Sequence, residues 1–329
     1  MKNKHCFLIA VFTAFLLYGC GEAEELGIIP RFADPSDQTT TEIQVNLPRI
    51  LHTTAEGSEE TFEVYVMVTD QDENLISRLN ASNFALHWSC DENQHVCLER
   101  FSFSFERQRI PMALAITMDY SNSMSVDDIM QMEEAVRQFV QMLEPHDMVQ
   151  IIKFSDQVEV MNAFSGDQAV IAAAIDQTFQ RGATAFYQSI HSGLINLADL
   201  EHNTPDPLFP IVIAFTDGAD NSSQVSLQEV MDLSIAFQVP VYTVGLGAVN
   251  HAVLGSIADH SGARYYYTPD ASGIAAAFTT ISSQVSNYYL LGFTLQSPSC
   301  RTMEVMVDVT YRNALGDHQG RGTKSFIFP

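Results

Sequence analysis

The middle of the chain alternates between wholly apolar runs and amphipathic runs, and this alternation restricts the fold more than any other feature. Residues 112–118 form a run that is apolar except for Thr117, which is typical of a strand covered on both faces in a parallel sheet. Apolar residues then recur at three- and four-residue intervals over 126–143, which predicts a helix packed on that sheet. The alternation continues with strands expected at 148–154, 158–161, 211–216 and 239–244 and helices at 168–179, 185–200, 226–237, 251–259 and 272–286. We therefore predict a doubly wound α/β fold with a mostly parallel sheet.

The segments on either side of this region read as strands without helices. Within residues 61–69, Phe62, Val64, Val66 and Val68 fall at every second position and so on one face, which is the period of a half-buried strand. Further strands are expected within 83–89, 96–109, 288–295, 303–309 and 323–328. Because a few short strands rarely form a stable sheet alone, we expect both segments to build one small β-sandwich, into which the α/β region is inserted.

The composition excludes one class of partner. The chain carries 40 Asp and Glu against 16 Lys and Arg, with a formal net charge of -24. This charge repels phosphate backbones, so nucleic acid is not an expected partner. The hydrophobic fraction of 46% is ample for one large domain or two smaller ones with packed cores.

The first 20 residues resemble a bacterial lipoprotein signal peptide. Lys2 and Lys4 precede an apolar run at 6–18, which is the pattern of an export signal and too short to span a bilayer comfortably. Residues 17–20 read Leu-Tyr-Gly-Cys and resemble the lipobox, whose cysteine, here Cys20, receives the lipid. We expect a palmitate-carrying lipoprotein anchored to a membrane of the bacterial cell envelope, the outer membrane in a Gram-negative organism. The alternative is an ordinary cleaved signal with Cys20 incidental.

These observations divide the chain into five segments. They are a signal peptide at 1–20, a tether at 21–42, a first half of the sandwich at 43–110, the α/β domain at 111–287 and a second half of the sandwich at 288–329. The tether is acidic and then rich in Pro, Asp and Thr, with little hydrophobic periodicity.

The cysteines fit an exported chain. Cys90 and Cys97 lie close in sequence, and in an oxidising envelope they are expected to form a disulfide, with Cys300 left over. A zinc site that combines these two cysteines with His87 and His95 is the alternative, although their spacing matches no standard zinc finger.

Carboxylates and hydroxyls occur at three places where a predicted strand ends or a predicted helix begins. Asp119, Ser121 and Ser123 come directly after the first apolar strand, Thr184 precedes a predicted helix, and Asp217 follows a second apolar strand. Open parallel sheets bind ligands at the edge where the carboxyl ends of their strands meet. Two carboxylates and three hydroxyls form an all-oxygen set that suits Mg²⁺. Each signal alone has a plainer explanation, because Ser and Asp also cap helices and Asp-Gly pairs also form turns.

Together, the D-x-S-x-S sequence at 119–123, Thr184 and the Asp217-Gly218 pair resemble the metal-ion-dependent adhesion site of von Willebrand factor type A domains. The resemblance covers about residues 111–287 and implies a Rossmann-like fold. It also implies one Mg²⁺ or Mn²⁺ ion held by Asp119, Ser121, Ser123, Thr184 and Asp217, and a partner protein whose Asp or Glu completes the metal shell. Tyr120 and Asn122 replace the small residues common between the ligands in this family, which leaves them available to shape the partner surface.

Motifs for catalysis are missing from the sequence. No P-loop, no G-x-S-x-G elbow and no H-E-x-x-H sequence occurs, and Gly245-x-Gly247 lacks the third glycine of a dinucleotide fingerprint. We therefore expect a binding protein and not an enzyme, with no organic cofactor. Two alternatives stay open: a metal-independent scaffold of an envelope assembly, and a metal-assisted hydrolase, for which no general base is evident.

Overall fold

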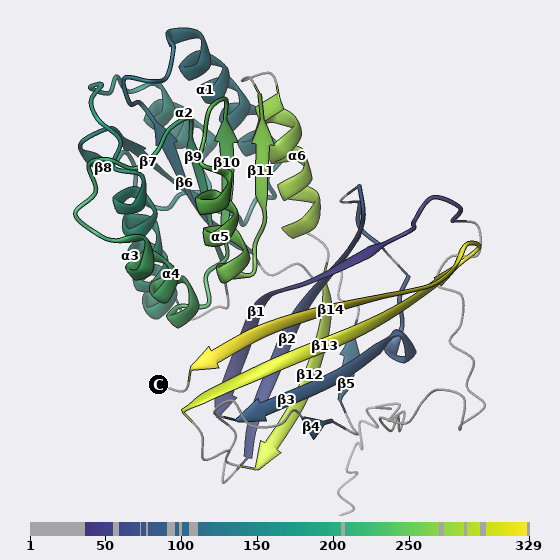
Figure 1. The fold of residues 1–329 in the computed structure, drawn as a ribbon. Coiled ribbons are helices and arrows are strands. Elements are labelled where there is room, and N and C mark those ends of the chain that lie inside the picture. The colour runs from purple at the N-terminus through teal and green to yellow at the C-terminus, as the bar shows by residue number, and fades with distance from the viewer. Residues whose placement is uncertain are drawn as a thin grey trace, which may run out of the picture.

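The computed structural model describes most of the chain beyond the N-terminal segment, and Figure 1 shows an α/β unit beside a β-sandwich. The described residues are 37–54, 59–72, 74–76, 78–90, 96–98, 101–104, 111–204, 208–269, 273–285, 288–296 and 301–327. Cys20, the tether up to residue 36 and Cys300 lie outside these ranges. Within them, the structure has no helix that is both long enough and apolar enough to cross a membrane.

The α/β unit is built on a six-stranded sheet with the order β11-β10-β9-β6-β7-β8. In chain order, its strands are β6 (Met112–Asp119), β7 (Met148–Phe154), β8 (Val158–Val160), β9 (Phe209–Thr216), β10 (Val241–Leu246) and β11 (Tyr265–Thr268). Neighbouring strands pair in parallel, except that β8 pairs antiparallel with β7. The sheet therefore has one edge at which the carboxyl ends of its parallel strands meet.

Helices cover both faces of this sheet. One face packs against α1 (Val126–Gln141), α2 (Gln168–Asp176) and α6 (Ile274–Val285), and the other against α3 (Phe186–Asn203), α4 (Leu227–Ala236) and α5 (His251–Ser261). Strand β6 is buried along its whole length because both of its faces are covered. Leu114 and Met118 face the core beneath α1, α2 and α6, and Ala113 and Ala115 face the core beneath α3, α4 and α5. The alanines let α3 approach closely, since a Cβ added to Gly193 would lie 3.2 Å from the Cβ of Ala115.

Two four-stranded antiparallel sheets form the β-sandwich around a single core. The first sheet has the order β1-β2-β12-β5, with β1 (Ile43–Thr54), β2 (Glu59–Asp70), β12 (Tyr289–Gln296) and β5 (Ser102–Ser104). The second has the order β14-β13-β3-β4, with β14 (Gly316–Ile327), β13 (Thr302–Asn313), β3 (Phe84–Cys90) and β4 (Val96–Cys97), and the short helix η1 (Ala81–Asn83) precedes β3. Strands from before and after the α/β unit pair with each other in both sheets. This arrangement confirms the predicted fold class.

Most predicted elements occur within a few residues of their expected bounds, and three differences are informative. The patterns do not predict β1, and they begin the last strand at 323, whereas β14 begins at Gly316. The helix predicted to end at 179 ends at Asp176, because Gln177 has an extended backbone with a ψ of 130°.

Buried cationic side chains join the two units. Arg49 of β1 donates a hydrogen bond from Nη1 to the carbonyl oxygen of Leu208 at 3.0 Å. Lys324 of β14 donates from Nζ to the carbonyl oxygen of Ser261, the last residue of α5, at 2.7 Å. Arg264 of the α/β unit donates in the opposite direction, to a hydroxyl of β2. The sandwich is therefore fixed against the α/β unit by specific polar contacts as well as by apolar packing.

The described residues do not show which cysteine pairs with Cys90. Strand β4 pairs with β3 so that His87 lies opposite Cys97. The side chain of Cys97 and all of His95 lie outside the described residues. The disulfide and its zinc alternative therefore stay predictions.

Candidate metal centre

The predicted ligands lie at the carboxyl edge of the central sheet. Asp119 is the last residue of β6, and Thr216 is the last residue of β9, which pairs in parallel with β6. The loop after β6 leads into α1, whose N-cap is Ser125; its hydroxyl accepts a hydrogen bond from the backbone nitrogen of Asp128 at 3.1 Å. The loop that carries Ser121 and Ser123, here called the metal loop (residues 120–125), is thus fixed at both ends.

Four of the five predicted residues form a continuous chain of hydrogen bonds. Oδ1 of Asp119 accepts from the backbone nitrogen of Ser121 at 2.7 Å. The hydroxyls of Ser121 and Ser123 lie 2.9 Å apart, and the Ser123 hydroxyl donates to Oδ1 of Asp217 at 2.7 Å. The other oxygen of Asp119 accepts from the hydroxyl of Thr216 at 2.7 Å. The loops after β6 and β9 therefore meet through their side chains.

Thr184 reaches the same place from the segment before α3. A Cβ added to Gly218 would lie 3.5 Å from Oγ of Ser123 and 3.8 Å from Oγ1 of Thr184, so both hydroxyls lie close to this glycine. The backbone of the two loops is also joined, because the nitrogen of Asn122 donates to the carbonyl oxygen of Gly182 at 2.9 Å. The structure thus brings all five predicted residues together.

The electrostatics of the site favour a cation. Burial raises the pKa of Asp119 to about 6 and also raises the pKa of Asp217. Asp119 is 0% exposed, and its hydrogen-bond partners are a backbone nitrogen and hydroxyls, with no Lys or Arg of the described residues paired to it. Charged groups in protein interiors are normally paired or bound to a metal. The donor set of two carboxylates and three hydroxyls therefore fits a hard divalent cation.

This pKa predicts that metal binding depends on pH. A protonated carboxyl group cannot act as a ligand, so protons compete with Mg²⁺ below about pH 6. At pH 5 only about one tenth of the Asp119 side chains would be ionised without metal, so we expect roughly tenfold weaker Mg²⁺ binding than at pH 7. Calorimetric titration with Mg²⁺ at both pH values checks this. Equal affinities at pH 5 and pH 7 would contradict the assignment of Asp119 as a ligand.

Two neighbours that sequence reasoning did not single out support the site. Thr216, next to Asp217, is fully buried and its hydroxyl is bonded to Asp119. Arg181 donates from Nη2 to the carbonyl oxygen of Ser121 at 2.9 Å and also to that of Met124, and so holds the metal loop from the side. Its position before the Gly182-Ala183-Thr184 segment is the only sequence signal for this role.

The structure separates the roles of the two unusual residues of the metal loop. Tyr120 is 4% exposed and therefore does not shape a partner surface, so this expectation is wrong for it. Its ring lies in the core beneath the loop, at 5.5 Å from the ring of Phe179. Asn122 is exposed, as a residue that faces a partner would be.

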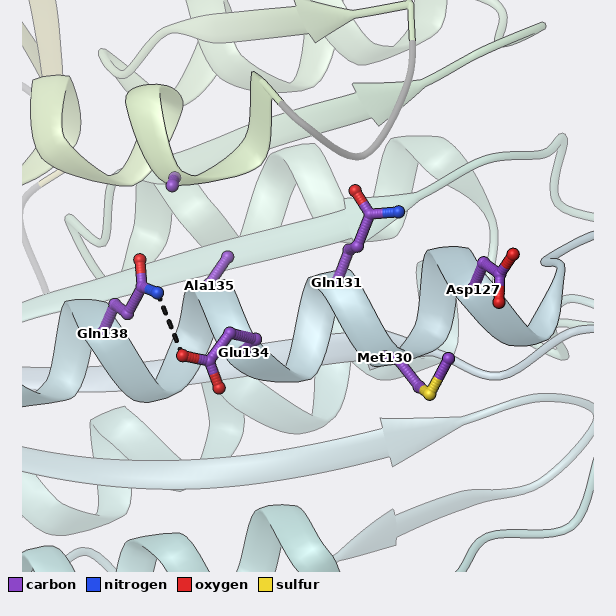
Figure 2. A pocket seen from close by; sticks show the side chains of 7 residues that line it. Asp127, Met130, Gln131, Glu134, Ala135 and Gln138 are labelled. Atoms are coloured by element: carbon purple, nitrogen blue, oxygen red, sulfur yellow. Dashed lines mark hydrogen bonds between the residues drawn. The ribbon is translucent and has the colours of Figure 1, made fainter.

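An open groove of about 350 Å³ runs along α1, which starts where the metal loop ends. It is lined by Asp127, Met130, Gln131, Glu134, Ala135 and Gln138 of α1 and by Ala275 of α6. In Figure 2, Gln131 and Ala135 point from α1 toward the neighbouring helix, and Gln138 bonds to Glu134. The lining contains two acidic side chains and no basic one.

Comparisons with known proteins agree with this geometry. Calcium-activated chloride channel regulator 1 of Bos taurus is 27% identical over 192 residues, which cover 56% of this chain and 20% of that protein. Inter-alpha-trypsin inhibitor heavy chain H3 of Homo sapiens is 25% identical over 202 residues, which cover 57% of this chain and 22% of that protein. The chain therefore spans less than half the length of the curated relatives it matches.

A solved structure and a domain profile extend the comparison. The structure of a von Willebrand factor type A protein from Catenulispora acidiphila superposes with a TM-score of 0.50 at 13% identity, covering 91% of this chain and 75% of that one. This likeness concerns the fold and includes the sandwich. The sequence profile of the von Willebrand factor type A domain matches residues 114–280, which is half of the chain and contains all five candidate ligands. The chain therefore belongs to the von Willebrand factor type A domain family.

Proposed function

We propose that this protein binds a partner protein through a divalent cation, Mg²⁺ or Mn²⁺, held by Asp119, Ser121, Ser123, Thr184 and Asp217. Three of these ligands are neutral hydroxyls, so they would leave much of the positive charge of a bound cation uncompensated. An Asp or Glu of the partner would gain a charge-assisted bond at this charge.

One observation carries the proposal. Asp119 and Asp217 lie at one sheet edge, with raised pKa values, among three hydroxyl groups and without a paired cation in the described part of the chain. An arrangement that only capped α1 would not need one buried and one partly buried carboxylate, because Ser125 and Asp128 already form the capping box of that helix.

Several observations favour binding over turnover. The hydrogen bonds of Asp119 and Asp217 go to hydroxyl groups and backbone nitrogen, and no histidine of the described residues bonds to either of them. A hydrolase would need a general base within hydrogen-bond reach of a metal-bound water. The two relatives compared above are named as a channel regulator and an inhibitor heavy chain, and neither name describes an enzyme.

The rim of the site indicates what the partner would carry beside its carboxylate. Asp127 and Asp128 occupy the first turn of α1, and Glu134 lies further along the groove. These charges would repel a purely acidic segment and attract a basic one. The site therefore suits a partner segment in which the metal-binding Asp or Glu is accompanied by Lys or Arg.

We also propose that the protein is anchored by lipid at Cys20 to a bacterial envelope membrane. The support is the export-signal pattern and the lipobox-like sequence at 17–20. Such an anchor would hold the adhesion site close to a membrane surface and restrict it to partners of the same envelope.

The proposed function predicts metal-dependent capture of a partner. Immobilised protein is mixed with bacterial envelope extract in Mg²⁺, and the retained proteins are compared with those retained in EDTA. We expect one retained protein to fall by at least about tenfold in EDTA, because loss of the charge-assisted bond costs on the order of 1.5 to 3 kcal/mol.

Two results would point elsewhere. A partner retained equally well in Mg²⁺ and in EDTA would support the alternative of a metal-independent scaffold. A control with Mg²⁺ added back after EDTA should restore capture, and failure to restore it would show that the chelator had acted by another route.

A further inference from the structure

A lysine lies fully buried beneath the metal loop. The side chain of Lys153 in β7 is 0% exposed. Lysine is almost never fully buried unless its charge is paired. Burial lowers the pKa of Lys153, and the nearby carboxylate of Glu133 acts in the opposite direction. A buried charge of this kind needs partners.

The ammonium group of Lys153 joins three elements. It donates hydrogen bonds to the carbonyl oxygens of Ile175, at 2.6 Å, and Gln177, both at the end of α2. This end of a helix carries partial negative charge, and α2 has no basic residue of its own there. The same group lies 3.9 Å from Oε1 of Glu133 in α1 and 4.6 Å from the ring centre of Tyr120.

Tyr120 connects this group to the metal loop. It stands between the candidate ligands Asp119 and Ser121, and its hydroxyl donates to Oε1 of Glu133 at 2.6 Å. Its backbone nitrogen donates to the carbonyl oxygen of Phe154, the residue after Lys153, at 2.7 Å. This one residue between two ligands is therefore held by α1 through its hydroxyl, by β7 through its backbone, and by α2 through the lysine beside its ring.

We propose that Tyr120, Glu133 and Lys153 form a positioning network that sets the metal affinity of the loop, an inference that rests on the proposed function. Single hydroxyl ligands contribute little unless they are held in place before the cation arrives. A small residue at position 120 would make no contact with Glu133 or Lys153. The ring and hydroxyl of Tyr120 make these contacts and thereby fix the backbone of the metal loop. None of the three residues is itself a ligand.

The test is the substitution Tyr120→Phe, which keeps the ring beside Lys153 and removes only the hydroxyl bond to Glu133. We expect Mg²⁺ binding by the variant to weaken about tenfold, or about 1.4 kcal/mol, which is close to the lower end of the range for a hydrogen bond to a charged group. Calorimetric titration with Mg²⁺ alone measures this. Circular dichroism before titration verifies that the variant is folded.

The control is Tyr289→Phe, which removes another buried tyrosine hydroxyl, far from the metal loop. Tyr289 lies in β12 of the sandwich, where its hydroxyl donates to the carbonyl oxygen of Ile76 at 2.9 Å and accepts from the nitrogen of Leu79. It should lose a similar amount of stability and keep its Mg²⁺ affinity. A purely structural role of Tyr120 would give the same result for both variants.

Two further variants extend the test to Glu133. Glu133→Gln retains an acceptor for the Tyr120 hydroxyl and should bind Mg²⁺ within about threefold of the original chain, whereas Glu133→Leu should fall as far as Tyr120→Phe. Unchanged affinity in Tyr120→Phe and Glu133→Leu would overturn the positioning network alone. Absence of Mg²⁺ binding by the unmodified chain would overturn the proposed metal site and this inference together.

Discussion

Replacing Asp119 by alanine should remove Mg²⁺ binding while leaving the α/β fold intact. The carboxylate is fully buried and organises the loop by accepting from the nitrogen of Ser121 and the hydroxyl of Thr216. Without it, one carboxylate and three hydroxyls remain, so we expect affinity to fall by more than about a hundredfold. The metal-free variant should lose little stability, because the lost hydrogen bonds are offset by removal of a carboxylate that is costly to bury.

Asp147→Ala is the matched control for this experiment. Asp147 is also buried, at 3% exposure, but it lies at the opposite end of β6, where Oδ1 accepts from the nitrogen of Met112 at 2.8 Å. It should destabilise the chain without weakening Mg²⁺ binding. Titration of both variants, with thermal unfolding in EDTA, separates the two effects. If Asp119→Ala binds Mg²⁺ as tightly as the unmodified chain, recognition lies elsewhere on the molecule.

The central sheet could be predicted because its strands are buried on both faces. Residues 112–118 and 211–216 are therefore apolar except for Thr117 and Thr216, and carboxylates and hydroxyls follow where each strand ends. The same property located the ligands, since an Asp directly after such a run must lie at the carboxyl edge. Their chemistry and their placement were thus both visible in the sequence.

The sandwich was harder to predict because its strands do not all follow the simple alternating pattern. Pro48 cannot donate to a neighbouring strand, and the pairing of β1 with β2 shifts register between Asn46 and Arg49. The first half of β14 carries no large apolar residue, and Gly320 and Gly322 lie where a Cβ would come within 2.8 Å of Val45. Close contact with β1, and not hydrophobic periodicity, determines that part of the strand.

Partners across the fold could not be predicted from periodicity at all. A pattern indicates which face of an element is buried, but not which residue from a distant element lies against it. Lys153 reads as an ordinary charged residue within an apolar run, and Lys324 as an outward-facing one. Both are buried, since α2 and α5 supply carbonyl oxygens that each lysine can bond to.

Replacing Lys324 by methionine should stabilise the protein near neutral pH. Lys324 is buried between the sandwich and α5, and loss of hydration, together with repulsion from Arg49, lowers its pKa to about 7 from the ordinary lysine value of 10.5. Between pH 7 and 10.5 the unfolded chain therefore binds more protons than the folded one, so this group makes stability rise with pH across that window. At pH 7 and below its cost is largest, up to about 5 kcal/mol. Loss of the bond to Ser261 offsets part of the gain, leaving about 2 to 3 kcal/mol of net stabilisation at pH 7 and little at pH 10. Urea unfolding in EDTA at both pH values, followed by circular dichroism, measures this.

Arg321→Met, on the same strand but exposed and paired with Asp308, should change stability by less than about 1 kcal/mol and leave the pH dependence in place. A Lys324→Met variant that is less stable than the original chain at pH 7 would contradict this prediction. The contacts of Lys324 between the two units would then contribute more free energy than burial of its charge costs.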